Sequence, residues 1–324
     1  MAAISEPLSP ALAKDHLRPF DIRRDLGAVA DLVELCFADT LDPDGRDYLA
    51  RMRSAASGTS IMGMAKGWAS VPMAGFVWEQ DGRIVGNASL IPYFLTGRRS
   101  FLIANVAVHP EYRRRGIARR LTEKAVAYTR ERGCPAVWLH VRAENPGALQ
   151  LYRSLGFQDR AVRTTWMGNP DYAAAENPPG IRFISPGGQH WPLLSAWLRS
   201  SYPPELSWHM PFHQNNLKPG FIGFISRFLY NTYIHQWGVL RGGRLMAAAA
   251  WQATGSHANV IWLAAPPDGE NEVVRLLLEH VRHHAPTRRA LALDYPAGQN
   301  DQAIRNAGFV EQQTLVWMSL TFYR

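Results

Sequence analysis

The sequence predicts an α/β protein of two similar halves. Each half is expected to hold a mixed, mostly antiparallel sheet with a central parallel strand pair and flanking helices. The first observation is a strand, helix and strand between residues 102 and 142, because such a crossover joins parallel strands. The second is a repeat: Gly156, Phe157, Trp166 and Met167 recur at nearly the same spacing as Gly308, Phe309, Trp317 and Met318. Third, 324 residues are enough for two domains.

The net positive charge of the chain bears on which partners it binds. Lys and Arg total 35 against 27 acidic residues, a net charge of +8. Such an excess fits nucleic acid, an anionic cofactor or a solvated surface. The one dense basic cluster, residues 113–120, has a phosphate-binding explanation of its own (below), so we expect no nucleic-acid partner.

Cysteine content and hydropathy point to a cytoplasmic protein. Cys36 and Cys134 lie far apart without metal-ligand spacing, so we expect reduced thiols and no metal site. We find no run of about eighteen uninterrupted apolar residues and no signal-peptide pattern, so no membrane partner is expected.

The chain before residue 100 is expected to form a tail, a strand, two helices and a hairpin. Residues 1–16 are the tail, Leu17 to Ile22 the strand, and Leu26 to Phe37 the first helix, with a second helix around Tyr48 to Met52. Asp81 and Gly82 mark a hairpin between residues 76–79 and 84–94.

Two segments of this region admit two interpretations each. Residues 39–45 form an acidic loop that either attracts an amine or is a solvated turn. Residues 57–72 either cover an acceptor site or pack as a surface segment.

Phosphate-binding features follow the apolar run from Leu102 to Val108, which is typical of a buried strand. After Pro110 comes Arg113-Arg114-Arg115-Gly116-Ile117-Ala118 and then a helix of apolar periodicity. Small residues at a helix start leave amide N–H groups accessible at the positive end of the helix dipole, which suits a phosphate. The spacing fits neither a Walker loop nor a Rossmann turn.

The ordered set of strand, Arg113-x-x-Gly116-x-Ala118, helix, strand, Asn145 and Leu151-Tyr152-x-x-x-Gly156-Phe157 resembles the acetyl-CoA-binding core of the GNAT superfamily of N-acetyltransferases. The resemblance implies acetyl-CoA as the acyl-donor cosubstrate. It implies splayed central strands that admit the pantetheine arm. The cofactor-binding residues that it implies are Val106, Val108, Arg113, Arg114, Arg115, Gly116, Ile117, Ala118, Arg119, Asn145 and Tyr152. Asn145 equally suits a helix N-cap before Pro146.

The resemblance also implies two catalytic residues and an oxyanion donor. The main-chain N–H at Val106 would face the thioester oxygen, and Tyr152 would protonate the departing thiolate. His140 stands where relatives that acetylate protein N-termini carry a glutamate, which makes it the candidate base. Alternatively, Tyr152 packs a helix face, His140 is a structural strand residue, and Glu79 or water acts as the base.

The second half is expected to repeat the first without its chemistry. Residues 260–264, 272–284 and 290–294 fall where the central strand, cofactor helix and next strand would lie. Residues 266–272 place acid where the arginine loop stood, and Ile304 replaces Tyr152, so this half should not bind acetyl-CoA. The expected domains are 17–168 (catalytic) and 181–324 (degenerate), joined by a linker at 169–180.

The expected function is transfer of an acetyl group from acetyl-CoA to a primary amine by direct attack in a ternary complex. The acceptor is a small-molecule or peptide amine that the sequence does not identify. The alternative is an acyl-CoA-binding regulatory or interaction module without turnover. We expect a monomer, because a tandem pair can satisfy its sheet contacts internally, with a homodimer as the alternative.

Overall fold

The computed structural model describes residues 16–57, 74–95, 97–171, 179–208, 210 and 212–322. These residues fall into two compact units. The first comprises the described residues within 1–92, 100–137 and 321–324, and the second those within 93–99 and 138–320. The domain bounds expected near residues 168 and 181 were drawn from the sequence repeat. They differ from the bounds of these two units and remain a prediction.

The first unit holds the predicted helix pair, hairpin and crossover helix. The predicted first strand ends at Pro19 and not at Ile22, because Asp21 caps a helix that begins at Ile22. Its sheet runs in the order β1-β2-β3-β4. The elements are β1 (Leu17–Pro19), α1 (Ile22–Phe37), a 3-10 turn (Ala38–Thr40), α2 (Pro43–Ala56), β2 (Ala74–Gln80), β3 (Arg83–Leu95), β4 (Arg98–Val108), a 3-10 turn (Pro110–Tyr112), α3 (Ile117–Glu131) and the start of β5 (Ala136–Arg142).

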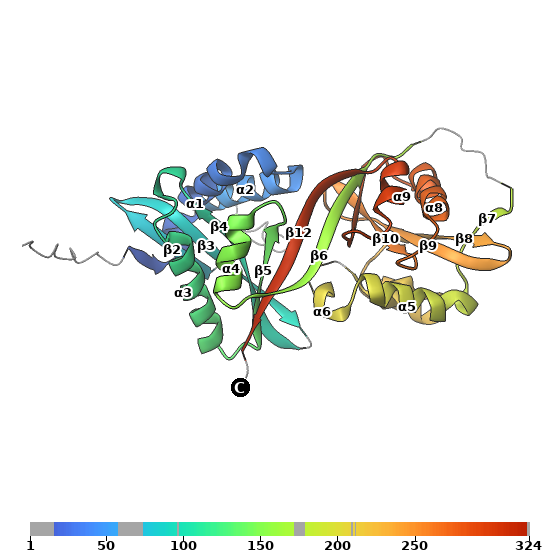
Figure 1. Ribbon diagram of the computed structural model, residues 1–324, viewed down its shortest axis with the longest axis horizontal. Helices are drawn as coiled ribbons and strands as arrows, with labels where there is room; N and C mark the ends of the chain where they lie inside the picture. Colours follow the sequence, from blue (N-terminus) through green and yellow to red (C-terminus); the bar gives the residue numbers. More distant parts are fainter. Residues whose placement is uncertain are drawn as a thin grey trace, which may run out of the picture. The chain divides into compact units, whose positions relative to one another are not determined.

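The core of the first unit lies between the helix pair and the sheet. Helices α1 and α2 lie together (Figure 1), and their apolar residues form one buried cluster with Val77 of β2 and Ala107 of β4. On β3, Gly86 meets α3, where a Cβ would lie 2.8 Å from Ile117 Cγ2 and 3.0 Å from Leu121 Cδ1. Glycine therefore allows the close approach of α3 to the sheet.

The predicted hairpin is confirmed, and its turn explains why. Asp81 and Gly82 both have positive φ, 52° and 75°, between strands that pair antiparallel. Two residues of positive φ match the twist of the flanking strands, and Asp-Gly adopts them at low cost. Gly242 and Gly243 repeat the arrangement in the second unit, with φ of 56° and 78°.

The second unit carries strands in the order β5-β12-β6-β11-β10-β9-β8-β7. The central pair β10 and β11 is parallel, as predicted, while β11–β6, β12–β6, β10–β9, β9–β8 and β8–β7 are antiparallel. The strands after β5 are β6 (Gln158–Gly168), β7 (Ile181–Ile184), β8 (Ile234–Arg241), β9 (Arg244–Gln252), β10 (Ala258–Ala264), β11 (Ala290–Pro296) and β12 (Val310–Thr321). The helices are α4 (Pro146–Ser154), α5 (Trp191–Ser201), α6 (Pro204–Ser207), α7 (Phe221–Leu229), α8 (Asn271–His284) and α9 (Asp301–Asn306), with 3-10 turns at Gly188–His190 and Gln214–Leu217.

The sequence repeat has a structural counterpart at the two helix–strand junctions. Gly156 ends α4 with φ 90°, and Phe157 N donates to Tyr152 O at 3.1 Å. Gly308 ends α9 with φ 81°, and Phe309 N donates to Ile304 O at 3.3 Å. The same glycine cap therefore leads into β6 and into β12, and Ile304 stands where the first copy has a tyrosine.

Strand β6 links the two repeats within the second unit. It pairs with β12 on one side and β11 on the other, so β12 lies between β5 and β6. The buried Arg163 of β6 forms an ion pair with Asp294 of β11, and its Nη1 donates to Ser201 O at 2.7 Å. These bonds satisfy a buried guanidinium that would otherwise be costly.

Candidate active site

Strand β4 is distorted where the sequence places the oxyanion donor. Asn105, directly before Val106, has φ 52°, which a regular strand does not contain. The distortion is held by side chains: Asn87 Nδ2 donates to Asn105 O at 2.8 Å, and Asn105 Nδ2 donates to the Tyr48 hydroxyl at 3.1 Å. Val106 and Val108 themselves are half-buried. The main chain of β4 thus departs from the regular ladder at the predicted residues.

Sequence reasoning missed the polar residues that hold this distortion. Asn87 is fully buried on β3, and Tyr48 comes from α2. Burial raises the pKa of Tyr48 to about 12, opposed by the hydrogen bond from Asn105, so its phenol is neutral near pH 7. An asparagine inside an apolar strand run was the available signal, because asparagine tolerates a left-handed backbone better than other side chains.

The start of α3 presents an open backbone turn. Arg114 and Gly116 have φ of 63° and 80°, and Gly116 is the N-cap without a side-chain hydrogen bond. The first turn of α3 holds no acidic residue. Its first amides have no acceptor one turn back, and the helix dipole places positive charge there. Apart from Gly116 itself and its two chain neighbours, no heavy atom of the described residues would lie within 4 Å of a Cβ at this position, so a ligand can approach the backbone.

Basic side chains surround that turn. Arg113, Arg114, Arg115 and Arg119 are exposed. Two of them also brace the turn: Arg113 Nε donates to Val108 O at 3.2 Å, and Arg115 Nη2 donates to Glu111 O at 2.9 Å. The structure therefore brings the arginine turn onto the end of β4.

Ile117 and Ala118, which the resemblance also implies as cofactor residues, are less exposed than the arginines. Ile117 is buried and its side chain packs against Gly86 of β3. Ala118 is half-buried. Any contact that Ile117 makes with a ligand would therefore use its main chain.

Asn145 and Tyr152 lie on α4 in the second unit. Asn145 is the N-cap, and its Oδ1 accepts from Ala148 N at 3.0 Å, with Pro146 in the first turn. The predicted capping role is confirmed. Tyr152 is buried, and its ring meets Phe157 edge-on at 6.0 Å between centroids. Burial raises the pKa of Tyr152 to about 12.

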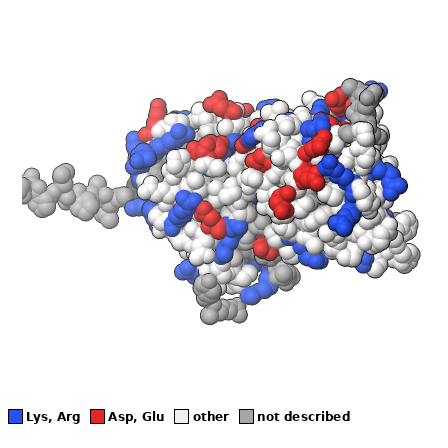
Figure 2. Space-filling model, turned by 45° about the vertical axis from the view of Figure 1, so that its right-hand side comes forward, with Lys and Arg blue, Asp and Glu red and all other residues white. Residues whose placement is uncertain are grey.

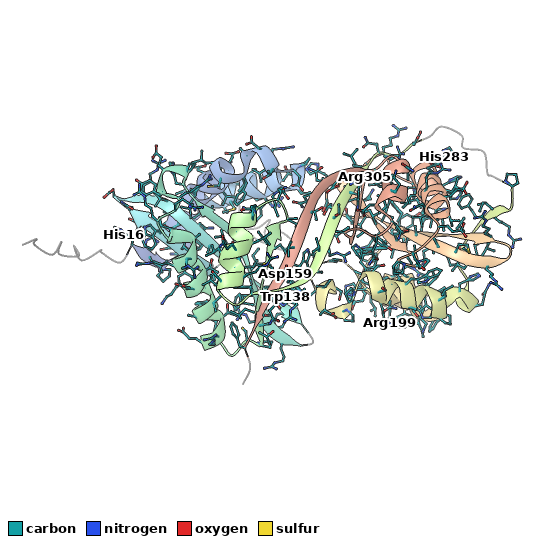
Figure 3. All side chains as sticks on the ribbon, viewed as in Figure 1. His16, Trp138, Asp159, Arg199, His283 and Arg305 are labelled. Atoms are coloured by element: carbon teal, nitrogen blue, oxygen red, sulfur yellow. The ribbon has the colours of Figure 1, made fainter. Side chains whose placement is uncertain are left out.

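His140 on β5 is stacked among aromatic rings of the second unit. Its ring lies 4.1 Å from that of Trp317 at an angle of 28°, and 6.1 Å from that of Trp208. Trp138, labelled on β5 in Figure 3, meets Trp208 edge-on at 5.8 Å, and Tyr93 stacks on Trp208 at 3.7 Å. We call Tyr93, Trp138, His140, Trp208 and Trp317 the aromatic cluster. Its partners come from distant segments, so the sequence alone could not assemble it.

Glu79, the alternative base, is held as an anion by two arginines. Its carboxylate accepts from Arg18 Nε at 2.6 Å and from Arg24 Nη2 at 2.9 Å. The Arg18 hydrogen bond is the largest influence and lowers the pKa of Glu79 despite opposing desolvation. A carboxylate stabilised in this way is a weak base, so we do not retain Glu79 in that role.

The expected acidic loop at 39–45 is largely ordered structure. Residues 38–40 form a 3-10 turn, and Asp42 caps α2 by accepting from Gly45 N at 2.6 Å. The predicted loop between the two helices therefore ends at Asp42 and not at Gly45, because Asp42 followed by Pro43 is an N-cap and first-turn proline. The segment that was expected either to cover an acceptor site or to pack on the surface lies, over residues 58–72, outside the described residues.

The second unit differs at the position that corresponds to the arginine turn. Helix α8 begins after Glu270, which forms an ion pair with Arg241, and Glu272 lies in its first turn. Negative charge near a helix start stabilises the helix but opposes an anionic ligand. The loss of cofactor binding in this half stays a prediction.

Three features of the described residues bear on metal, membrane and nucleic-acid binding. These residues contain no group of His, Cys, Asp or Glu that could hold a metal ion. Among the same residues no helix is both long and apolar enough to span a bilayer. On the face drawn in Figure 2, basic and acidic side chains lie interspersed, whereas a polyanion favours a continuous basic surface.

Comparison with known proteins finds similarity over the segment that contains this turn. The acetyltransferase (GNAT) family matches residues 38–157, which include β4, the arginine turn, α3 and α4. Residues 38–157 are therefore similar to this family. The [ribosomal protein bS18]-alanine N-acetyltransferase of Escherichia coli is 40% identical over 67 residues, which are 21% of this chain and 45% of that enzyme. N-alpha-acetyltransferase RimI of Mycobacterium tuberculosis is 37% identical over 85 residues, 26% of this chain and 52% of the relative.

The whole chain matches the fold of a solved GNAT protein. A GCN5-related N-acetyltransferase from Sphaerobacter thermophilus aligns with a TM-score of 0.58 and 17% identity, over 95% of this chain and 96% of that chain. At this identity the match shows the fold alone. It covers the second half as well as the first, which confirms the predicted tandem GNAT-like fold. The curated relatives above are matched over only about half of their length.

Proposed function

We propose that this protein is an acetyl-CoA-dependent N-acetyltransferase that transfers the acetyl group to a primary amine by direct attack in a ternary complex. The observation that supports this best is the uncapped start of α3. It combines the left-handed Gly116, open space beside it, and exposed arginines. These features suit a diphosphate, because amide N–H groups and guanidinium groups are strong donors to phosphate oxygens.

The proposed cofactor path runs from the arginine turn along β4. The residues that would hold acetyl-CoA are Val106 and Val108 through their main chain and residues 113–119 through amides and guanidinium groups, with Asn145 and Tyr152 as implied by the resemblance. Acetyl-CoA supplies the activated acyl group as a thioester. The distortion at Asn105 supports this path, because a strand that leaves its ladder offers main-chain groups to a ligand.

The proposed roles of the catalytic residues follow from their surroundings. A Tyr152 phenol of pKa about 12 is neutral near pH 7 and can donate a hydrogen bond to a developing thiolate. Full proton transfer from it to a thiolate of pKa about 8.5 would be uphill by roughly 5 kcal/mol. We therefore propose that Tyr152 stabilises the leaving group as a hydrogen-bond donor. His140 is the candidate base, and its stacking on Trp317 would orient the ring.

The proposed acceptor is an amine, either of a small molecule or of a peptide. The name of the Escherichia coli relative identifies its acceptor as an alanine of ribosomal protein bS18. A peptide with an N-terminal alanine therefore belongs in the acceptor panel, beside polyamines, amino acids and aminoglycosides. Neither Cys36 nor Cys134 forms a disulfide, which fits the cytoplasmic location that we propose.

Calorimetric titration with acetyl-CoA and release of free thiol with the amine panel test this proposal. We expect saturable heat and amine-dependent thiol release. Arg114→Gln should weaken acetyl-CoA binding several-fold, whereas Arg130→Gln, which removes the same charge at the other end of α3, should not. Absence of heat would overturn the cofactor assignment. Heat without turnover on any amine would identify a binding module instead.

A further inference from the structure

Helix α7 of the second unit has its apolar side turned away from the protein. The residues that face inward are small or polar: Gly223 and Ser226 are buried. A Cβ at Gly223 would collide with Lys218 O, and the Ser226 hydroxyl donates to Asn216 Oδ1. This is the reverse of an ordinary surface helix, whose apolar stripe faces the core.

The outward side of α7 is a large apolar surface. Phe221 and Phe228 are 75% and 77% exposed. The exposed apolar residues of the helix, which we call the α7 face, are Phe221, Ile222, Phe224, Ile225, Phe228 and Leu229. Taking about 200 Å² for a fully exposed side chain, they present on the order of 700 Å². The largest apolar patch of a typical monomer is about 300–600 Å², and one side of a standard protein interface is about 800 Å².

We propose that the α7 face is a homodimer interface, in which α7 of one chain packs antiparallel against α7 of a second copy about a two-fold axis. The estimated area is close to what one partner contributes to a stable interface. The composition also fits, because interface cores are rich in aromatic residues and poor in charge. The homodimer was the alternative to the monomer that the tandem sequence favoured.

The spacing of the apolar residues suits a two-fold pair. Phe221, Phe224, Ile225 and Phe228 follow the i, i+3, i+4, i+7 pattern of a helix-packing seam. The spacing of these four residues is the same from either end of the helix. In an antiparallel pair Phe221 therefore meets Phe228 of the second copy, and Phe224 meets its Ile225. A two-fold interface requires such self-complementarity.

A lipid surface fits the α7 face less well than a second copy does. Interfacial helices bring Lys and Arg to the headgroups from their polar side. On α7 the single basic residue, Arg227, is committed to the protein, since its Nη1 donates to Asn216 O at 2.8 Å. The polar side of this helix is thus turned inward and holds no cation directed at a membrane.

Sedimentation equilibrium of the full chain at about 50 µM, a concentration at which interfaces of this size associate, tests the proposal. We expect the wild type to be a dimer. Phe228→Glu should weaken the dimer about thirtyfold or more, as loss of an interface hot spot does. Phe94→Glu is the matched control, because Phe94 is 70% exposed and lies outside the α7 face, on β3. This variant should dimerise like the wild type.

A charge-pairing experiment tests the antiparallel geometry directly. Phe221→Glu and Phe228→Lys should each be monomeric alone, and an equimolar mixture should form a heterodimer through one Glu–Lys pair. Thermal unfolding of each variant close to that of the wild type shows that folding is intact. A wild type that stays monomeric, Phe228→Glu that dimerises fully, or a mixture without heterodimer would overturn the proposal. A monomeric wild type that sediments with anionic vesicles, and loses this with Phe228→Glu, would assign the face to lipid.

Discussion

Gly116→Ala should separate the binding role of the arginine turn from its role in folding. Gly116 has φ 80°, where an L-residue costs roughly 1–2 kcal/mol. Beyond the two chain neighbours, no described heavy atom would lie within 4 Å of the added Cβ, so we expect no packing penalty. The free energy of unfolding should therefore fall by only about 1–2 kcal/mol.

Acetyl-CoA binding should fall much more than stability does. The methyl group would occupy the space through which a phosphate approaches the amides. Loss of one hydrogen bond to a charged acceptor costs about 1.5–3 kcal/mol, so the dissociation constant should rise at least about tenfold. Calorimetric titration measures the affinity, and urea unfolding measures the stability.

Gly82→Ala provides the matched control for this experiment. Gly82 has φ 75° and likewise no neighbour within 4 Å of a built Cβ, but it lies in the β2–β3 turn. It should show the same loss of stability with unchanged affinity for acetyl-CoA. Affinity of Gly116→Ala within twofold of the wild type, or an equal loss of affinity in Gly82→Ala, would refute the phosphate-binding role of the turn.

Three further substitutions test the remaining assignments. Tyr152→Phe should lower turnover about tenfold or more with acetyl-CoA still bound, because only the hydroxyl donor is lost; unchanged turnover in the thiol-release assay would remove Tyr152 from the mechanism. His140→Phe keeps the stacking on Trp317, so this variant should retain the wild-type melting temperature but lose turnover. His140→Ala should lose turnover and also melt at a lower temperature. An active His140→Phe variant would show that His140 is structural. Burial raises the pKa of Asp25, but the hydrogen bonds from Arg18 and from the Asp21 amide lower it by more, so the pKa lies below the ordinary value of 3.8. The stability that the ionised Asp25 contributes to the fold is therefore lost only as the pH falls below 3.8. Arg18→Gln should destabilise the fold by about 2–3 kcal/mol at pH 7 and move the acid transition to higher pH, since burial is then less opposed; an unchanged transition in pH-dependent unfolding would count against this account.

The local elements could be predicted because their signals are local. Asp81 and Gly82 supply the two positive φ values of a hairpin turn, and Gly156 supplies the helix cap, whatever surrounds them. The arginine turn was predictable for the same reason, since Gly116 and its neighbours form the helix start by themselves.

Other parts of the candidate site could not be predicted, because their partners are distant in sequence. The sequence left His140 open as a base or as a structural strand residue and gave no sign that Trp317 and Trp208 lie beside it. The distortion at Asn105 depends on Asn87 and Tyr48, which come from β3 and α2. No periodicity or spacing near residue 105 contains that information.

The sequence by itself predicted the GNAT-like core, the internal repeat and the acidic residues at 266–272 in place of an arginine loop. Each depends on backbone preferences and charges of neighbouring residues. Only the tertiary structure decided that β12 lies between β5 and β6, and that the apolar side of α7 faces outward. Strand neighbours and helix orientation are set by which distant surfaces pair, and the same alternation or helical period is compatible with several such pairings.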